Sequence, residues 1–150
     1  MGIKQTALEI ILKANSWETF VDELARFGSN PEFKKLKGEA FEQLTKFYLE
    51  SNPIFKSMFS EVWHHSDIPI NVLDNLKLPS PEIGVDLVAQ QIDGNFCAIQ
   101  CKFHQDETQN VSYDELSTFF SVTERKETYE KLSHRLVCTS ANEITNKVSK

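Results

Sequence analysis

The sequence predicts an α/β fold in which a central mixed β-sheet is flanked by helices, with an extra helical segment at the N-terminus. Apolar residues recur at helical spacing through the first 50 residues, which predicts amphipathic helices. Two apolar runs, 85–89 and 97–103, are separated by a short polar turn and predict a β-hairpin. A helical stretch then separates this hairpin from another apolar run, so helices and strands alternate along the chain.

The first third of the chain predicts three helices. An apolar helical pattern covers the first 27 residues and is interrupted near Asn15 and Ser16, where Ser16 is suited to cap the second piece. A third and longer helix is predicted from about Phe33 to Glu50, because its apolar face is broad and the dipeptide Asn52-Pro53 follows its end.

Shorter elements are predicted in the rest of the chain. A short aromatic strand is expected from Phe59 to His64, and one or two helical turns around Val72 to Leu76. After the hairpin, the pattern predicts a helix around Tyr113 to Thr123. The apolar run from His134 to Ser140 then predicts a buried strand.

The C-terminal residues predict the beginning of a further helix. Ser140 and Glu143 have the spacing of a capping box, and Ile144 and Val148 begin an apolar helical stripe. The pattern stops after barely two turns. We therefore expect these 150 residues to be the N-terminal part of a longer polypeptide.

Composition and charge restrict the class of protein. The chain lacks an apolar run of about 18 residues and a secretory signal, which predicts a soluble, cytoplasmic protein. Three cysteines, Cys97, Cys101 and Cys138, cannot all pair, which fits a reducing compartment. A net charge of -6 argues against nucleic-acid binding by the whole surface and leaves local basic patches such as 34–37.

The register of the hairpin follows from its apolar pattern. The apolar residues of the two strands share one side only if directly opposed residues have numbers of equal parity, which requires an odd number of loop residues. A three-residue loop of Ile92, Asp93 and Gly94 meets this condition, with Gly94 in the left-handed conformation. This register places Asp86 opposite Gln100.

The opposite side of the hairpin then carries three polar residues, Asp86, Gln100 and Lys102. A structural Asp–Lys pair on a half-exposed sheet would contribute roughly 0.2 to 1 kcal/mol to stability. The alternative is a functional site, because strand interiors normally disfavour Asp and Lys. The geometry alone leaves both interpretations open.

Short motifs in the order helix, strand, hairpin, helix, strand resemble the PD-(D/E)xK nuclease superfamily. "GVDLVA" and "AIQCKF" resemble its Mrr-like variant, which has Gln where most members have Glu. Gly38 and Glu42 match a Gly-x-x-x-Glu pattern on the preceding helix. More narrowly, the stretch from Lys37 to Ser140 resembles the N-terminal nuclease domain of type ISP restriction enzymes and related predicted helicases.

The resemblance implies a restriction-endonuclease-like fold and a metal-dependent DNA endonuclease. It divides the chain into an N-terminal helical segment, residues 1–32, and a nuclease core, residues 33–150. It implies Mg²⁺ as the cofactor, with Mn²⁺ as a substitute. The implied metal ligands are the Asp86 carboxylate, the Gln100 side-chain oxygen, the Cys101 backbone carbonyl and Glu42.

The same resemblance implies roles for basic residues and for partners. Lys102 would orient the attacking water or stabilise charge in the transition state. Double-stranded DNA is the implied substrate, and a helicase or translocase in the parent chain is the implied partner. The residues expected to contact DNA are Lys34, Lys35, Lys37 and His104. Because Gln carries no charge, a second ion should be harder to hold, which favours one-metal catalysis.

Several residues also have simpler explanations. Glu42 could form an ordinary surface pair with Lys46, four residues later. His64, His65 and His104 could contact phosphate or assist a metal, or could be ordinary strand-end and loop histidines. For the whole chain, the alternative to an endonuclease is a noncatalytic DNA-binding or protein-docking module on a nuclease scaffold.

Overall fold

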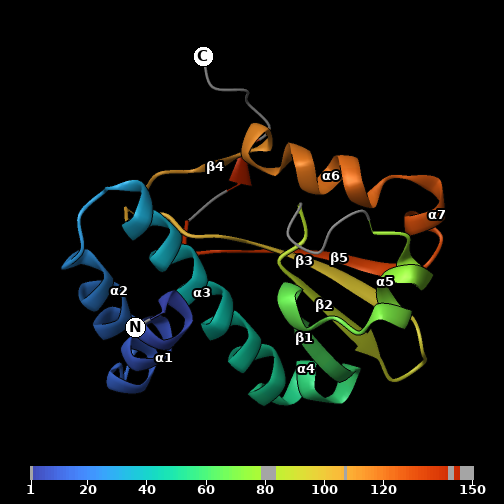
Figure 1. Cartoon of the computed structure of the whole chain (residues 1–150), viewed down its shortest axis with the longest axis horizontal. Coiled ribbons are helices and arrows are strands. Elements are labelled where there is room, and N and C mark those ends of the chain that lie inside the picture. The colour runs from blue at the N-terminus through green and yellow to red at the C-terminus, as the bar shows by residue number, and fades with distance from the viewer. Residues whose placement is uncertain (1, 79–83, 107, 142–143, 146–150) are drawn as a thin grey trace.

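The computed structural model describes residues 2–78, 84–106, 108–141 and 144–145 (Figure 1). The elements in chain order are α1 (Ile3–Lys13), α2 (Trp17–Ala25), α3 (Pro31–Ser51), α4 (Pro53–Met58), β1 (Phe59–His64), η1 (His65–Asp67), α5 (Ile70–Leu76), β2 (Leu87–Gln91), β3 (Phe96–Lys102), β4 (Val111–Ser112), η2 (Tyr113–Leu116), α6 (Ser117–Thr123), α7 (Lys126–Tyr129), β5 (Leu132–Thr139) and β6 (Ile144–Thr145). None of the helices among these residues is long and apolar enough to cross a bilayer.

The three predicted N-terminal helices are confirmed. The Ser16 hydroxyl accepts a hydrogen bond from the Thr19 backbone N–H and so caps α2 as expected. Helix α3 begins at Pro31, which suits a first helical position because proline has no N–H to donate. It ends at Ser51, and the Asn52 side chain then caps α4.

The main sheet has the strand order β1-β2-β3-β5. Strands β1, β2 and β3 are antiparallel neighbours, and β3 pairs with β5 in parallel, so the sheet is mixed as predicted. A separate two-stranded ladder joins β4 and β6 in parallel. This architecture confirms the expected α/β class and is consistent with a restriction-endonuclease-like fold.

The predicted hairpin register is confirmed. Ala89 lies opposite Cys97, and the Gln91 N–H donates to the Asn95 carbonyl at 2.7 Å across a three-residue loop. Gly94 has a φ of 91°, the left-handed conformation that such a loop requires. Strand β2 begins at Leu87, later than the apolar run predicted. Val85 does not share a face with Leu87 and Ala89 but packs in the core on the other side of the sheet.

Two hydrophobic cores lie on opposite faces of the sheet. Helices α1, α2 and α3 cover one face, where the N-terminal helices share a single core with Leu87 and Ile99. Helices α5 and α6 cover the other face, where Val88 and Ala98 are buried. Both central strands are therefore enclosed, and α3 lies between α1 and β1 (Figure 1).

Two predictions near the C-terminus are wrong. Strand β5 is not buried but lies at an edge of the sheet, half-exposed over most of its length. The expected helix after Ser140 is replaced by β6, which begins at Ile144. The Ser140 hydroxyl is already used: it accepts from the His104 N–H at 2.7 Å and donates to the His104 carbonyl at 3.0 Å. Glu143 and Val148 lie outside the described residues.

Gly84→Ala is expected to lower the free energy of unfolding by more than Gly94→Ala does. Both glycines have positive φ, which costs a side chain about 1–2 kcal/mol. At Gly84 a Cβ would also lie 3.0 Å from the Thr118 carbonyl oxygen, whereas at Gly94 it would meet nothing within 4 Å. Urea denaturation of the two variants measures the difference. Equal losses would show that the close approach to α6 carries no energetic weight.

Candidate active site

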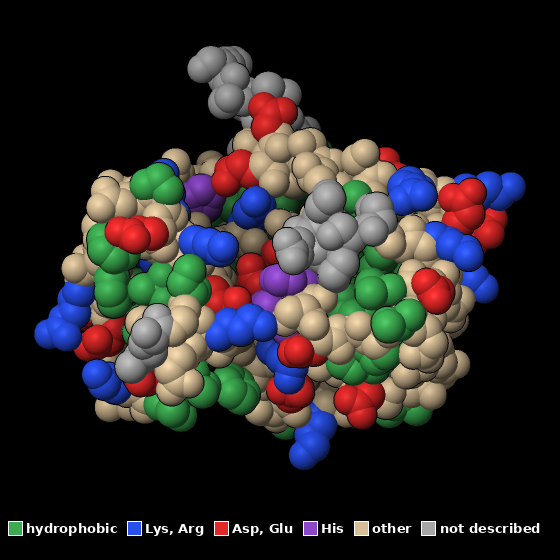
Figure 2. Space-filling model, viewed as in Figure 1, with side chains coloured by type: hydrophobic (Ala, Val, Ile, Leu, Met, Phe, Trp, Pro, Cys, Tyr) green, Lys and Arg blue, Asp and Glu red, His purple; other side chains and the backbone are tan. Residues whose placement is uncertain are grey.

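A cavity of about 620 Å³ lies between α3 and the ends of β2 and β3 that face it. Its lining includes most of the predicted site residues: Lys34, Lys37, Glu42, Asp86, Gln100, Cys101, Lys102 and His104. Figure 2 shows acidic and histidine side chains at the bottom of a hollow on this face, with Lys or Arg side chains around it. Lys35 is exposed and is not among the described residues that line the cavity.

Asp86 is held immediately before β2 by backbone contacts. Its N–H donates to the Ile99 carbonyl at 3.0 Å, and its Oδ2 accepts from the Cys101 N–H at 2.7 Å. In an extended strand the N–H and C=O of one residue point to the same side, so the Cys101 carbonyl also faces Asp86. Burial and the charge of Glu42 raise the pKa of Asp86 to about 6, and the Cys101 N–H and Lys102 oppose that rise.

The simple Asp86–Lys102 ion pair is not what the structure contains. These two described residues form no ion pair within 4 Å, and Asp86 instead accepts the Cys101 N–H. Both side chains line the same cavity. The carboxylate and the ammonium group therefore face a common space rather than neutralising each other directly.

Gln100 is buried with an unsatisfied oxygen. The residue is 7% exposed, and its Oε1 has no hydrogen-bond partner among the described residues. A buried acceptor in this condition costs about 1–3 kcal/mol. Because Gln100 lines the cavity beside Asp86, its free oxygen is available to a cation, which fits the predicted ligand set.

Glu42 is not paired with Lys46, since that lysine contacts Glu50 at 2.8 Å. The Glu42 Oε1 instead lies 2.9 Å from Nε2 of His64 and 3.7 Å from Nε2 of His65. Its side chain is only 17% exposed. The helix therefore directs Glu42 inward, toward the end of β1 and the cavity, as a site residue requires.

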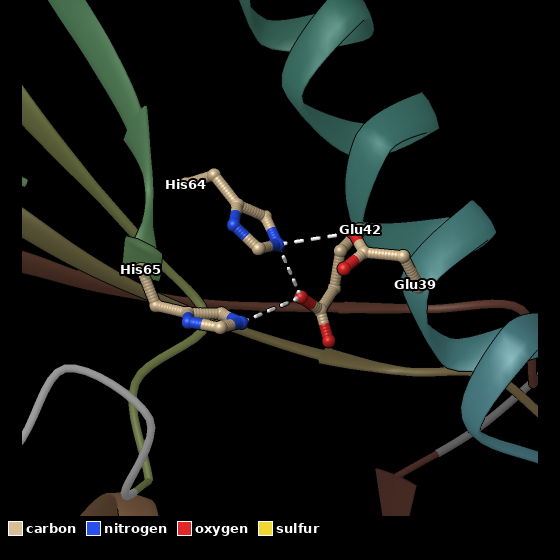
Figure 3. Close-up of side chains that lie close together, drawn as sticks. All are labelled: Glu39, Glu42, His64 and His65. Carbon is tan, nitrogen blue, oxygen red and sulfur yellow. Dashed lines mark hydrogen bonds and ion pairs between the residues drawn. The ribbon is translucent and has the colours of Figure 1, made fainter. Parts of the chain in front are cut away.

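Four residues form what we call the His–Glu cluster: Glu39, Glu42, His64 and His65 (Figure 3). Glu39 and Glu42 are three residues apart on α3 and so share one face, and the two histidines end β1 and begin η1. His64 Nε2 also lies 3.1 Å from Glu39 Oε2. One ligand atom from each residue lies within 4.8 Å of the others.

His64 carries a strongly shifted pKa. Burial lowers it, but hydrogen bonds and charge from Glu39 and Glu42 outweigh burial and raise the pKa of His64 to about 9. For Glu39, burial raises the pKa, and the hydrogen bond and charge of His64 reverse this and lower it overall. The sequence indicated His64 only as a secondary candidate and did not single out Glu39 as its partner, because their contact depends on how α3 packs on β1.

His104 lies at the rim of the cavity with a partner of its own. Its Nε2 is 2.9 Å from Glu115 Oε1, and Ser140 fixes its backbone. Glu115 in turn completes a capping box with Ser112 at the start of η2. His104 therefore connects the end of β3 to the segment that leads into α6.

Comparisons with known proteins show the family to which this chain belongs. A family model described as Mrr_cat_2, restriction endonuclease, matches residues 50–150. A solved structure described as the ATP-dependent type ISP restriction-modification enzyme LlaBIII bound to DNA is similar, with 26% identity and a TM-score of 0.58. The match covers 84% of this chain and 7% of that one. No curated protein matches the sequence. The chain belongs to the Mrr_cat_2 family of restriction endonucleases.

Proposed function

We propose that the chain is a Mg²⁺-dependent endonuclease domain that hydrolyses phosphodiester bonds in double-stranded DNA. The observation that carries the proposal is the free, buried oxygen of Gln100 beside Asp86 in a cavity that basic residues also line. Family membership and the similarity to a restriction enzyme that was solved on DNA support the same activity.

The proposed Mg²⁺ ligands are the oxygens of Asp86, Gln100, Glu42 and the Cys101 carbonyl. An all-oxygen set suits a hard divalent ion, and Mn²⁺ would be a substitute. When bound, the ion would neutralise charge on the phosphoryl oxygens and lower the pKa of a bound water. Gln100 contributes no charge, so this set favours a single ion for the chemistry.

Lys102 is the proposed stabiliser of the transition state. It follows Cys101 on β3 and lines the same cavity as Asp86. An ammonium group placed there can orient the attacking water and stabilise negative charge that develops on the phosphate. This role needs Lys102 to remain unpaired with Asp86, in agreement with the observed contacts of the carboxylate.

The first turns of α3 are the proposed DNA-contacting surface inside the cavity. Lys34 and Lys37 both line the cavity, and each can neutralise a phosphate. Lys35 is exposed and does not line the cavity, so it is a weaker candidate than the sequence indicated. By similarity to the ATP-dependent enzyme, we propose an ATP-driven translocase as the functional partner of this domain.

Glu42→Gln is expected to reduce Mg²⁺-dependent cleavage of supercoiled plasmid by roughly a hundredfold, because one charged ligand is lost. Glu50→Gln is the matched control, since Glu50 lies on the same helix but pairs with Lys46 at the surface. Isothermal titration with Mg²⁺, run beside the cleavage assay, reports metal binding directly.

Cleavage and Mg²⁺ affinity that do not depend on Glu42 would contradict the proposed ligand set. Tight DNA binding without Mg²⁺ binding, in a protein that never cleaves, would support the noncatalytic docking module instead. Cleavage that EDTA does not abolish would contradict the metal dependence.

A further inference from the structure

The His–Glu cluster brings two carboxylates and two imidazoles together between α3 and the end of β1. All of its ligand atoms lie within 4.8 Å of one another. The side chains are largely buried, with exposed fractions of 6% for His64, 13% for Glu39, 17% for Glu42 and 21% for His65. Figure 3 shows both rings from the end of β1 turned toward the two carboxylates of α3.

We propose that the His–Glu cluster is a second cation site, which binds a divalent transition-metal ion such as Zn²⁺. This site is distinct from the proposed Mg²⁺ site around Asp86 and shares only Glu42 with it. The claim concerns metal binding and does not depend on whether the chain cleaves DNA.

The spacing of the ligand atoms agrees with one ion. Bonds of about 2.0–2.1 Å in a tetrahedral site place neighbouring ligand atoms about 3.3–3.4 Å apart. Three of the observed separations are 2.9, 3.1 and 3.7 Å. Each of these lies within about half an ångström of the tetrahedral value, so small rotations of the carboxylates would complete this part of the site.

The ligand types select against Mg²⁺. Imidazole nitrogen is a common ligand of Zn²⁺ and other late transition metals, whereas Mg²⁺ prefers oxygen and keeps several waters. Two carboxylates balance the charge of a divalent ion when both imidazoles are neutral. The two neighbouring sites would therefore separate metals by chemistry, with oxygen ligands around Asp86 and mixed nitrogen and oxygen ligands in the His–Glu cluster.

A supporting contact orients His64. Its Nδ1 lies 2.9 Å from the Ser66 hydroxyl, which accepts a hydrogen bond from Lys4 Nζ at 2.6 Å. Without metal, Nδ1 also accepts from the Ser66 backbone N–H at 3.4 Å, so metal binding at Nε2 would move the ring proton to Nδ1. Metal-binding histidines usually donate their second ring N–H to such a group, which fixes the ring and the tautomer. Nε2 is then the nitrogen that faces Glu39 and Glu42, as observed.

The cluster is accessible from two sides. Glu39 and His64 line a separate cavity of about 210 Å³, and Glu42 lines the larger one that contains Asp86. An ion would replace the proton that now lies between His64 and the carboxylates. The cluster is thus either a histidine that donates a hydrogen bond to the glutamates or a metal site, and binding experiments distinguish these states.

The test uses the 150-residue chain and titration with Zn²⁺, with Co²⁺ absorption spectra to report nitrogen ligands and tetrahedral geometry. Wild type is expected to bind one such ion even when Asp86→Asn removes the proposed Mg²⁺ site. Glu39→Gln and His65→Asn should each weaken Zn²⁺ binding by more than about 10- to 100-fold. His134→Asn, at an exposed histidine of β5, is the matched control and should leave binding unchanged.

Several outcomes would overturn the proposal. These are no Zn²⁺ binding by wild type, binding that neither cluster variant weakens, or binding that Asp86→Asn abolishes. Circular dichroism and thermal melts of each variant identify misfolding, and the two cluster variants change different elements, so failure of one leaves the other informative. Loss of Zn²⁺ binding in Glu39→Gln with Mg²⁺-dependent cleavage retained would separate this site from the nuclease site.

Discussion

Asp86→Asn is expected to abolish Mg²⁺-dependent cleavage and, at the same time, to stabilise the metal-free protein near neutral pH. The substitution removes the principal charged ligand, so the cleavage rate should fall roughly a thousandfold or more. The amide oxygen of Asn can still accept the Cys101 N–H, so the local structure should persist. The Asp86 carboxylate would then destabilise the metal-free folded protein and yet be essential for cleavage with metal. This combination is expected of a metal-binding residue.

The pH dependence of this effect follows from the raised pKa. Burial and the charge of Glu42 raise the pKa of Asp86 to about 6 in the folded protein, whereas an unfolded chain has a value near 3.9. The folded state binds the Asp86 proton more tightly than the unfolded state does. Protonation of Asp86 therefore stabilises the folded protein fully below about pH 4, and this stabilisation is lost as pH rises through about 6. At pH 8 the ionised carboxylate costs on the order of 1–3 kcal/mol, which Asn avoids.

Urea denaturation of wild type and Asp86→Asn at pH 4, 6 and 8 measures this difference. The variant should gain stability relative to wild type between pH 4 and pH 8. Mg²⁺ at 100 times its Kd should stabilise wild type by about 2.7 kcal/mol and leave the variant unchanged. Asp93→Asn, in the exposed hairpin loop, should show neither effect. An Asp86→Asn protein that is less stable at pH 8, or that Mg²⁺ still stabilises, would contradict the assignment.

Lys102→Ala is expected to lower the single-turnover cleavage rate roughly 100- to 1,000-fold with Mg²⁺ binding retained. Lys102 shares the cavity with Asp86 but is not its ion-pair partner, so its loss leaves the ligands in place. The rate should be measured with saturating DNA and Mg²⁺, because the predicted loss lies in the chemical step rather than in binding.

Lys34→Ala is the matched comparison for Lys102→Ala, because Lys34 also lines the cavity but stands on α3. It should weaken DNA binding and reduce the salt dependence of that binding by about one phosphate contact, with the rate at saturation unchanged. A Lys102→Ala protein that behaves in the same way would assign Lys102 to DNA binding instead of catalysis.

Structural features that depend on residues close together in the sequence were predictable. Parity required an odd number of hairpin loop residues, because a one-residue slip would move the apolar residues of one strand to the opposite face. The position of Gly94 then selected the three-residue loop. The helix capped by Ser16 followed from side-chain chemistry within one turn. The same register placed Asp86, Gln100 and Lys102 on one side of the hairpin, and all three line the cavity.

The errors involve partners distant in sequence. The Ser140 hydroxyl bonds to His104, 36 residues away, so its capping-box spacing had no helix to cap. The His–Glu cluster depends on the packing of α3 against the end of β1, and helical spacing indicated only that Glu39 and Glu42 share a face. Neither contact has a periodicity that a single sequence could reveal.

Helices α1–α3 supply part of the hydrophobic core, although most of their residues lie outside the segment that matches the family. The family match begins at residue 50, yet more than half of the buried side chains on the α3 face of the sheet precede that residue. Lys4 of α1 also reaches Ser66, which supports His64. A fragment trimmed to the signature would expose one whole face of the sheet and lose Glu42. Laboratories that shorten this domain, or transplant it into another enzyme, should therefore keep the helices that the signature omits.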